Sequence, residues 1–261
     1  MSFERITVET DAGVRLIGLN RPAKRNAFDL QMYAELAQAY GAYERDGAAR
    51  CALLYAHGEH FTGGIELPQW LPLFRDARMP PLPDGAIDPL LRLQTLSKPL
   101  IIAVQGWCLT IGIELLLAAD IRVAAQTTRF AQIEVKRGIF PVGGATVRLV
   151  QELGWGNAMR ILLTADEFSA EDALRLGLVQ EVTPPGEQFA RALALAQTVA
   201  RQSPVGIRAT LASARMARAQ GEREAFARML PDLQVALASA DALEGLNAFL
   251  ERREPRFSDP A

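Results

Sequence analysis

Residues that bind metals or form cross-links are scarce in this sequence. Its 261 residues include two cysteines and two histidines. Cys51 and Cys108 each lie inside an apolar run, so a disulfide framework is excluded and we expect two buried structural thiols. His57 and His60 flank a Gly-Glu pair, with no cysteine close enough for a zinc pattern. We therefore predict no metal site and expect both histidines in a solvated turn.

Long apolar runs and a large charge of one sign are also missing. The longest apolar run covers residues 109–119, is interrupted by Glu114 and is too short to span a bilayer. A formal net charge of −2 provides no basic surface for nucleic acid or an anionic membrane. The N-terminal residues alternate like a strand and contain no apolar signal core. We expect a cytoplasmic protein that binds neither nucleic acid nor membrane.

Three widespread catalytic motifs are absent as well. The sequence has no GxSxG elbow, no Walker A loop and no GxGxxG following a strand pattern. These absences exclude the usual serine hydrolase, P-loop and dinucleotide-binding chemistries.

The pattern of apolar residues predicts an α/β fold. Apolar residues alternate on both sides of an Asp-Ala-Gly turn, which predicts a hairpin over residues 6–17. A helix is expected from Leu30, with Asp29 as its N-cap. Short apolar strands with helical periodicity between or after them indicate layered strands and helices. These strands are predicted at 52–56, 100–104 and 121–124.

The last part of the chain has a different character. It is rich in alanine, has helical spacing and carries no strand signal. About three helices are predicted there, over residues 187–202, 205–220 and 239–253. We divide the chain into an α/β core over residues 1–186 and an all-helical section over residues 187–261.

A proline-rich segment, residues 67–89, stands out between two of the predicted strands. It contains six prolines together with several large apolar side chains. Long connections without regular structure are usually functional or disordered, and the aromatic content favours a lid or a pocket wall. The side chains expected to line a pocket are Trp70, Leu71, Leu73 and Phe74.

Two glutamates are candidates for chemistry. Glu114 lies among apolar and small residues, and burying a carboxylate costs several kcal/mol unless it is hydrogen-bonded or protonated. Glu114 could instead be a first-turn glutamate that a helix dipole stabilises at a wet edge, and the local sequence leaves both readings open. Glu134 is the weaker candidate, because an exposed glutamate at a strand end, paired with Lys136 or Arg137, is ordinary.

Glycine-rich turns precede or follow these glutamates. Gly63 and Gly64 follow a predicted strand, and two adjacent glycines allow the next N–H to face a cavity, although a plain connecting turn is the alternative. Gly106 and Gly112 frame the turn before the Glu114 helix. The N-terminus of a helix offers unpaired N–H groups that suit a thioester oxyanion. A third such turn, over residues 141–146, leads into another helix.

Five segments, in this order and at this spacing, resemble signatures of the crotonase (enoyl-CoA hydratase) superfamily. Asn-Arg-Pro and Asn-Ala mark the first, Gly-Gly the second, and a glycine-rich turn before a helix with one glutamate the third. The segments are residues 19–28, 61–67, 104–120, 130–149 and 248–257. The resemblance covers nearly the whole chain. It implies a crotonase-like spiral of ββα units with an all-helical C-terminal section, and assembly as a homotrimer or a dimer of trimers.

The same resemblance implies a site for an acyl-CoA thioester. The N–H groups of Ile65 and Ile111 would form an oxyanion hole, and Glu114 and Glu134 would be the catalytic pair. No separate cofactor is implied, because coenzyme A arrives as part of the substrate. Contacts with the substrate are expected at Gly64, Gly112, Lys24, Ala27, Trp70, Phe74, Pro141, Phe249 and Arg252, with Phe249 near the coenzyme of a neighbouring subunit.

The sequence departs from the family pattern inside the proposed oxyanion hole. Glycines usually stand where this chain has Thr110 and Ile111, and a small residue stands at Ile65. An N–H needs no particular side chain, so the hole can persist. A β-branched residue at Ile111 would be costly if that position needed a positive φ. The two isoleucines are expected to narrow the pocket.

Retention of both glutamates implies hydration of a trans-2-enoyl-CoA to a 3-hydroxyacyl-CoA. One carboxyl group would deprotonate the water that adds to C3, and the other would protonate C2. We assign Glu114 as the base and Glu134 as the acid. The alternatives are isomerisation, thioester hydrolysis or decarboxylation on the same scaffold, or a non-catalytic acyl-CoA-binding protein.

Overall fold

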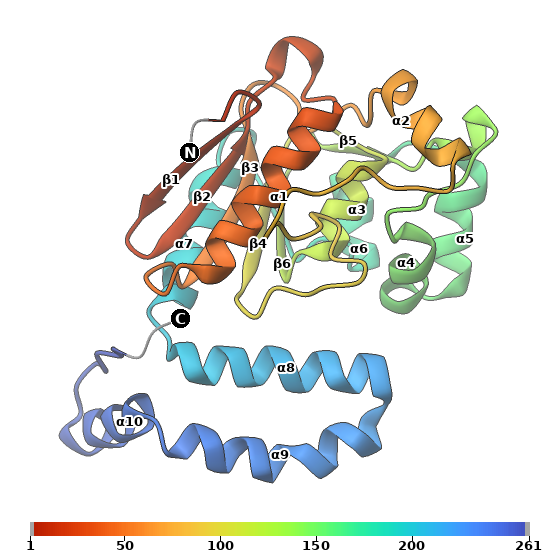
Figure 1. Cartoon of the computed structure of the whole chain (residues 1–261). Helices are drawn as coiled ribbons and strands as arrows, with labels where there is room; N and C mark the ends of the chain where they lie inside the picture. The colour runs from red at the N-terminus through yellow and green to blue at the C-terminus, as the bar shows by residue number, and fades with distance from the viewer. Residues whose placement is uncertain (1–2, 259–261) are drawn as a thin grey trace.

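The structure, a computed structural model, describes residues 3–258. The outer ends of the two predicted sections, residues 1–2 and 259–261, lie outside the described residues. Helices and strands form a layered body with a separate arm of helices beneath it (Figure 1). The predicted α/β class is confirmed. None of the helices described is long and apolar enough to cross a bilayer.

A six-stranded sheet forms the centre of the body. Its strands, in spatial order, are β1 (Ile6–Asp11), β2 (Val14–Leu19), β3 (Cys51–Ala56), β4 (Leu100–Val104), β6 (Ile121–Ala125) and β9 (Glu181–Thr183). The predicted hairpin is the antiparallel pair β1–β2, and the remaining neighbours are parallel. Because both faces of the parallel strands are covered, these strands read as continuous apolar runs, which is why they were predictable.

Alternate residues of the central strands pack on opposite faces of this sheet. Leu54 and Ile102 belong to the core on the side of α1 (Leu30–Arg45). Leu53 and Ile101 pack with α7 (Gln188–Ala200) on the other side. The two-residue period of a strand therefore builds two apolar layers from one run. Helix α1 begins as predicted, since the carboxylate of Asp29 accepts a hydrogen bond from Met32 N (2.7 Å).

A smaller sheet of three strands lies beside the first and positions the site. It consists of β5 (Trp107–Leu109), β7 (Arg129–Ala131) and β8 (Phe168–Ser169). Helix α3 (Ile111–Ala118) begins directly after β5, and the 3-10 helix Glu134–Arg137 follows β7. Because β5 and β7 run parallel, the segments that leave their ends emerge on the same side of the body.

Further helices complete this side of the body. Helix α4 (Ala145–Leu153) starts at the third glycine-rich turn, as predicted, and packs against α5 (Trp155–Thr164). Helix α6 (Ala170–Leu176) follows β8 with a capping box between Ser169 and Asp172.

The proline-rich segment is not a loop throughout. Residues 67–75 form helix α2 (Leu67–Arg75), which corrects the prediction of a long loop. Pro68 lies in the first turn, where no N–H is needed, and Pro72 lies inside the helix. Trp70 is buried and its Nε1 donates a hydrogen bond to Phe28 O (2.9 Å). The segment is thus a helix anchored to the body by its tryptophan.

The C-terminal part, as far as residue 258, forms four helices, one more than the sequence predicted. After α7 come α8 (Pro204–Gln220), α9 (Glu222–Leu237) and α10 (Ala240–Glu251). Helix α9 escaped prediction because Pro231 interrupts its pattern. Helix α7 packs on the sheet, whereas α8, α9 and α10 form an arm, here called the helical arm (residues 204–251), that extends from the body (Figure 1).

The cysteines and histidines lie within the body. Cys51 and Cys108 are buried free thiols, as predicted. The turn that the histidines flank is exposed at Gly58 and Glu59, as predicted, but both histidine side chains are partly buried. His60 Nδ1 accepts a hydrogen bond from Trp107 N (3.2 Å), and its ring stacks on the Trp107 indole at 4.9 Å. His57 Nε2 lies 2.8 Å from Thr7 Oγ1, so both rings tie strands together.

Candidate active site

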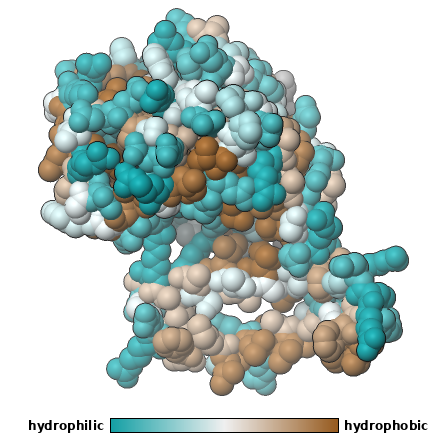
Figure 2. Space-filling view, turned by 180° about the vertical axis from the view of Figure 1, so that it is seen from behind, coloured by the Kyte–Doolittle hydropathy of each residue, from teal (hydrophilic) through white to brown (hydrophobic). Residues whose placement is uncertain are grey.

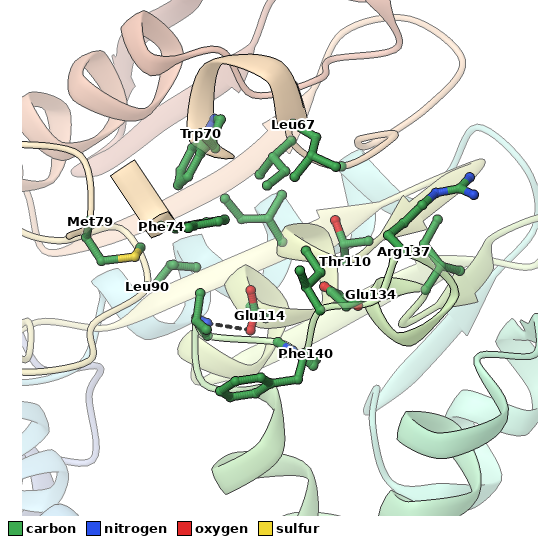
Figure 3. A pocket seen from close by; sticks show the side chains of 18 of the residues that line it. Leu67, Trp70, Phe74, Met79, Leu90, Thr110, Glu114, Glu134, Arg137 and Phe140 are labelled. Carbon is green, nitrogen blue, oxygen red and sulfur yellow. Dashed lines mark hydrogen bonds between the residues drawn. The ribbon is translucent and has the colours of Figure 1, made fainter. Parts of the chain in front are cut away.

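A cavity of about 230 Å³ lies between helix α2, the start of α3 and the segment after β7 (Figure 3). Its walls are mostly apolar, and its acidic groups are Glu114 and Glu134. Such a pocket, with few polar groups among apolar walls, is the usual form of a small-molecule site. The lining residues are Gly63, Gly64, Ile65, Leu67, Trp70, Phe74, Met79, Leu90, Thr110, Ile111, Glu114, Ile133, Glu134, Arg137, Ile139, Phe140, Pro141, Val142 and Gly143.

The N–H of Ile65 is left free by the pairing of its neighbours. Phe28 N donates to Gly64 O (2.8 Å) and Glu66 N donates to Phe28 O (2.9 Å). In a parallel bridge of this kind, the central residue directs its own N–H away from the pairing strand. No backbone hydrogen bond among residues 3–258 uses the N–H of Ile65, which lines the cavity.

The N–H of Ile111 is free because it begins a helix. The first N–H groups of α3 have no partner within the helix, and none among the described residues bonds that of Ile111. The adjoining residue, Thr110, has φ 50° and ψ −112°. The positive φ at this turn therefore falls on Thr110. Ile111, where a positive φ would have been costly, does not have one. The conformation of Thr110 is essentially restricted to glycine, so this residue stores backbone strain.

The two free N–H groups belong to segments that are tied together. Thr62 N donates to Trp107 O (2.9 Å) and Leu109 N donates to Thr62 O (3.1 Å). Gly64 touches Thr110, because a Cβ added to the glycine would lie 2.7 Å from Thr110 Oγ1. Glycine therefore permits the close approach of these two segments at the cavity wall.

Glu114 is buried beneath this wall with one carboxylate oxygen anchored. The residue lies in the first turn of α3 and is 5% exposed, which rules out the alternative of a wet edge. Its Oε1 accepts hydrogen bonds from Gly143 N (2.7 Å) and Ala145 N (3.3 Å). A side chain at Gly143 would overlap this carboxylate, so the glycine is required for the contact. Oε2 remains available to a ligand.

Opposing effects act on the pKa of Glu114. Burial raises the pKa, which disfavours the charged form. The N–H groups of Ala145 and Gly143 oppose the rise, as do the positive charges of Arg148 and Arg92. The N-terminus of α4 thus points at the carboxylate, where a helix dipole favours negative charge.

Glu134 is the second carboxyl group of the cavity. It begins the 3-10 helix Glu134–Arg137, and among the described residues it forms no ion pair with Lys136 or Arg137. Its Oε2 is buried without a hydrogen-bond partner, and Gln132 Nε2 lies 3.5 Å from Oε1. Burial, with a smaller contribution from the charge of Glu114, raises the pKa of Glu134 to about 7. A carboxyl group of this kind can carry a proton at neutral pH.

Other residues predicted to contact the substrate are divided between the cavity and the surface. Gly64, Trp70, Phe74 and Pro141 line the cavity, whereas Leu71 and Leu73 do not. Gly112 lies behind the wall, where a Cβ would overlap Thr62 and press on Cys108.

The remaining predicted contacts lie outside the cavity. Lys24 and Ala27 lie near its Gly63 end, where Gly63 N donates to Arg25 O (2.8 Å). Phe249 is 80% exposed on α10, and Arg252 follows that helix; neither lines the cavity of its own chain. These four contacts stay predictions.

Several lining residues were not foreseen from the sequence. Met79 and Leu90 come from the irregular stretch after α2, which carries no periodic signal. Arg137 and Phe140 flank Gly138, whose φ of 72° reverses the chain. Gly143 lies in a turn that the sequence marked as glycine-rich, and its close contact with Glu114 depends on the fold.

The chain is similar to proteins of known name over its whole length. The family model described as enoyl-CoA hydratase/isomerase matches residues 9–260. An enoyl-CoA hydratase of Mycobacterium tuberculosis is 35% identical over 97% of this chain and 96% of its own. The 2,3-dehydroadipyl-CoA hydratase of Escherichia coli is 31% identical over 98% and 99%.

Solved structures agree with these relatives. A probable enoyl-CoA hydratase/isomerase from Mycobacterium abscessus superposes with a TM-score of 0.96 at 47% identity, covering 99% of this chain and 100% of that one. An enoyl-CoA hydratase from Mycobacterium tuberculosis superposes with a TM-score of 0.87 at 33% identity, covering 97% and 98%.

Proposed function

The chain belongs to the enoyl-CoA hydratase/isomerase family, and on that premise we propose that it adds water to a trans-2-enoyl-CoA, giving a 3-hydroxyacyl-CoA. It is an enzyme of the enoyl-CoA hydratase type that acts on an acyl-CoA thioester. One observation supports hydration over the alternative reactions. Glu114 and Glu134, both with raised pKa, line a single cavity whose wall holds two unpaired N–H groups.

The thioester carbonyl lies between the N–H groups of Ile65 and Ile111 in this proposal. When water adds to C3, negative charge builds on the thioester oxygen as an enolate. Both N–H groups are fixed before the reaction, so they stabilise this charge without reorganisation. Loss of one such donor typically costs about 3 kcal/mol of transition-state stabilisation.

Glu114 acts as the base. The N–H groups of Gly143 and Ala145 hold Oε1, which leaves Oε2 to accept a proton from water. The oxygen of that water forms the new bond to C3. The two hydrogen bonds and the charge of Arg148 favour the ionised state that a base needs.

Glu134 acts as the acid. Its proton goes to C2 as the enolate collapses, so the product gains one oxygen and two hydrogens. A pKa of about 7 suits a proton donor at neutral pH. Glu114 is left protonated and Glu134 ionised, and exchange of a proton through solvent restores the starting state.

The test is incubation of the purified protein with crotonyl-CoA. Hydration removes the absorbance of the conjugated enone and adds the mass of one water to the thioester. A shift of the double bond leaves the mass unchanged, and thioester hydrolysis releases coenzyme A. Decarboxylation is tested on a thioester whose acyl group carries a carboxylate, which crotonyl-CoA lacks. If crotonyl-CoA and longer enoyl-CoAs all bind and all stay unaltered, the protein is a non-catalytic acyl-CoA-binding protein.

The remaining features of the proposal follow the same premise. Coenzyme A is part of the substrate and no separate cofactor or metal takes part. Phe249 and Arg252 contact the coenzyme bound by a neighbouring copy, in a homotrimer or a dimer of trimers. Lys24, Ala27 and Pro141 contact the coenzyme bound by their own chain. The enzyme works in the cytoplasm.

A further inference from the structure

A second cavity adjoins the first at the end formed by α2. This second cavity measures about 480 Å³. It shares part of its wall with the first and then extends to the surface. The shared residues are Phe74, Met79, Ile139, Phe140 and Val142. Ala77, Arg78, Arg92 and Gly138 complete the second cavity.

The direction of a bound substrate follows from the geometry of the first cavity. Figure 3 shows Met79, Phe74 and Leu90 on one side of Glu114, with Arg137 and Thr110 on the other. The segment that carries Lys24 and Ala27, the expected coenzyme contacts, adjoins the Gly63 end through the bond from Gly63 N to Arg25 O. With the coenzyme at the Gly63 end, an acyl chain that extends beyond C3 would point toward Phe74 and Met79, the side on which the second cavity lies.

Nη1 and Nη2 of Arg92 have no protein partner among the described residues, and Arg92 lines both the second cavity and a further one of about 570 Å³. Its side chain is 26% exposed, and its Nε donates to Asp88 Oδ2 (2.8 Å). The hydrogen bond from Nε to Asp88 orients the guanidinium. Nη1 and Nη2 remain as donors in one plane, a geometry that matches the two oxygens of a carboxylate.

The negative charge of Asp88 is shared among several donors. Besides Arg92, its carboxylate accepts hydrogen bonds from Tyr33 Oη (2.5 Å) and Leu90 N (3.0 Å). Asp88 is buried and does not line the second cavity. The second cation there, Arg78, is exposed and already paired with Asp76 (2.5 Å). Among the described residues, those that line the second cavity include two arginines and no acidic residue.

We propose that the acyl group of the substrate ends in a carboxylate and that Nη1 and Nη2 of Arg92 bind it. The claim rests on the proposed hydratase function and names its substrate class. An apolar stretch between the thioester and the far carboxylate would lie along Phe74, Met79 and Phe140. Those side chains set the length of the acyl chain that fits, and Arg92 sets the specificity for its charged end.

The experiment compares pairs of trans-2-enoyl-CoAs of equal length, one ending in methyl and one in carboxylate, across a series of chain lengths. The wild type should favour the carboxylate member at one length by about ten- to hundredfold in kcat/KM, the range expected for hydrogen bonds between charged groups. Arg92→Met should abolish that ratio. Arg92→Lys, which keeps the charge next to Asp88 but loses the fork, should retain only part of the ratio and serves as the variant if Arg92→Met fails to fold.

Arg78→Met is the matched variant within the same cavity, and it should change the ratio little because Arg78 is already paired. Hydration of both members at equal rates by the wild type would overturn this inference and leave the hydratase function intact. So would a ratio that survives in both Arg92 variants. Absence of hydration for every member would instead contradict the hydratase function itself.

Discussion

Burial and the nearby charge of Glu114 raise the pKa of Glu134 to about 7, and its Oε2 is buried without a hydrogen-bond partner. None of the three is visible in the local sequence, which reads as an ordinary exposed glutamate beside Lys136 and Arg137. Glu114 was the stronger candidate, because its neighbours in the chain are apolar, but the local sequence left a buried site and a wet edge equally open. What holds Glu114, namely the N–H groups of Gly143 and Ala145, comes from a distant turn.

The raised pKa of Glu134 predicts how the reaction depends on pH. As an acid, Glu134 must be protonated, a state that predominates below its pKa and declines above it. We expect kcat to fall as the pH rises through about 7. The residual kcat of Glu134→Gln should not show this fall with rising pH. A kcat that stays level from neutral to alkaline pH would contradict the assignment of Glu134 as the acid.

Thr110 makes a separate prediction about stability. Its φ of 50° with ψ of −112° is a glycine conformation, and its Oγ1 is buried without a partner. Relief of about 1–3 kcal/mol of strain should exceed the loss of about 0.5–1 kcal/mol that glycine brings through chain entropy. Thr110→Gly should therefore raise the free energy of unfolding by about 1 kcal/mol, or Tm by about 2–4 °C.

Thr210→Gly serves as the control for that measurement. Thr210 lies in helix α8, where glycine is unfavourable, so this substitution should lower Tm. A Thr110→Gly variant that loses stability to a similar extent would show that Thr110 is not strained.

The elements that the sequence predicted best are those whose environment is uniform along the chain. Strands β3 and β4 are covered on both faces, and helix α1 is capped by its own aspartate, so local residues suffice to predict them. The likeness to solved structures confirms the crotonase-like fold with its helical C-terminal section. Helix α2 was missed because its prolines read as loop, and α9 because Pro231 breaks its period.

Helix α2 controls the width of the acyl cavity. Phe74 is partly buried and stands where the two cavities meet, so it limits how far a chain can reach. Phe74→Ala should shift the preference toward longer acyl chains, measured as kcat/KM across a series of enoyl-CoAs, with only a small loss of stability. A variant that loses stability but keeps its ranking of substrates would identify Phe74 as a purely structural residue.

Trp70 is unsuitable for the same test, although the sequence had suggested it. Its ring is buried, its Nε1 is bonded to Phe28 O, and it packs edge-on against Tyr33 at 5.0 Å. Replacement of such a residue by alanine typically costs about 3–5 kcal/mol. Trp70→Ala should therefore unfold at a much lower temperature than Phe74→Ala.

On the scale of the whole molecule, the helical arm exposes more apolar surface than a monomer usually does. Apolar side chains gather along the arm, below the body (Figure 2). Those on α9 and α10 include Phe226, Leu230, Leu233, Leu246, Phe249 and Leu250. Exposed patches of this kind mark contacts between proteins, and symmetric copies of one chain are the commonest way to cover them.

We expect the protein to form trimers or pairs of trimers through this arm. Light scattering at micromolar concentration should give three or six times the mass of the chain. Phe226→Glu combined with Leu230→Glu should dissociate the assembly, because each copy would then bury two new charges. A wild type that scatters as a monomer would contradict this prediction and remove the expected role of Phe249 at a neighbour's coenzyme.

Hydration by this mechanism needs both carboxyl groups, Glu114 as base and Glu134 as acid, and the turnover number of Glu134→Gln is the sharpest test of that requirement. Glutamine keeps the shape of the side chain and removes its proton transfer. We predict that kcat for crotonyl-CoA hydration falls by about two or more orders of magnitude, and by a similar factor in Glu114→Gln. The double variant should be little slower than the slower single one, because groups that act as a unit are not additive.

Two controls accompany that measurement. Coenzyme binding should be unchanged, and Tm should hold or rise, because the uncharged glutamine avoids the cost of ionising a buried carboxyl group above its unfolded pKa. We expect Glu134→Gln to be a folded protein that binds substrate and scarcely hydrates it. Hydration at the wild-type rate would contradict the two-carboxylate mechanism and leave Glu114 to act alone.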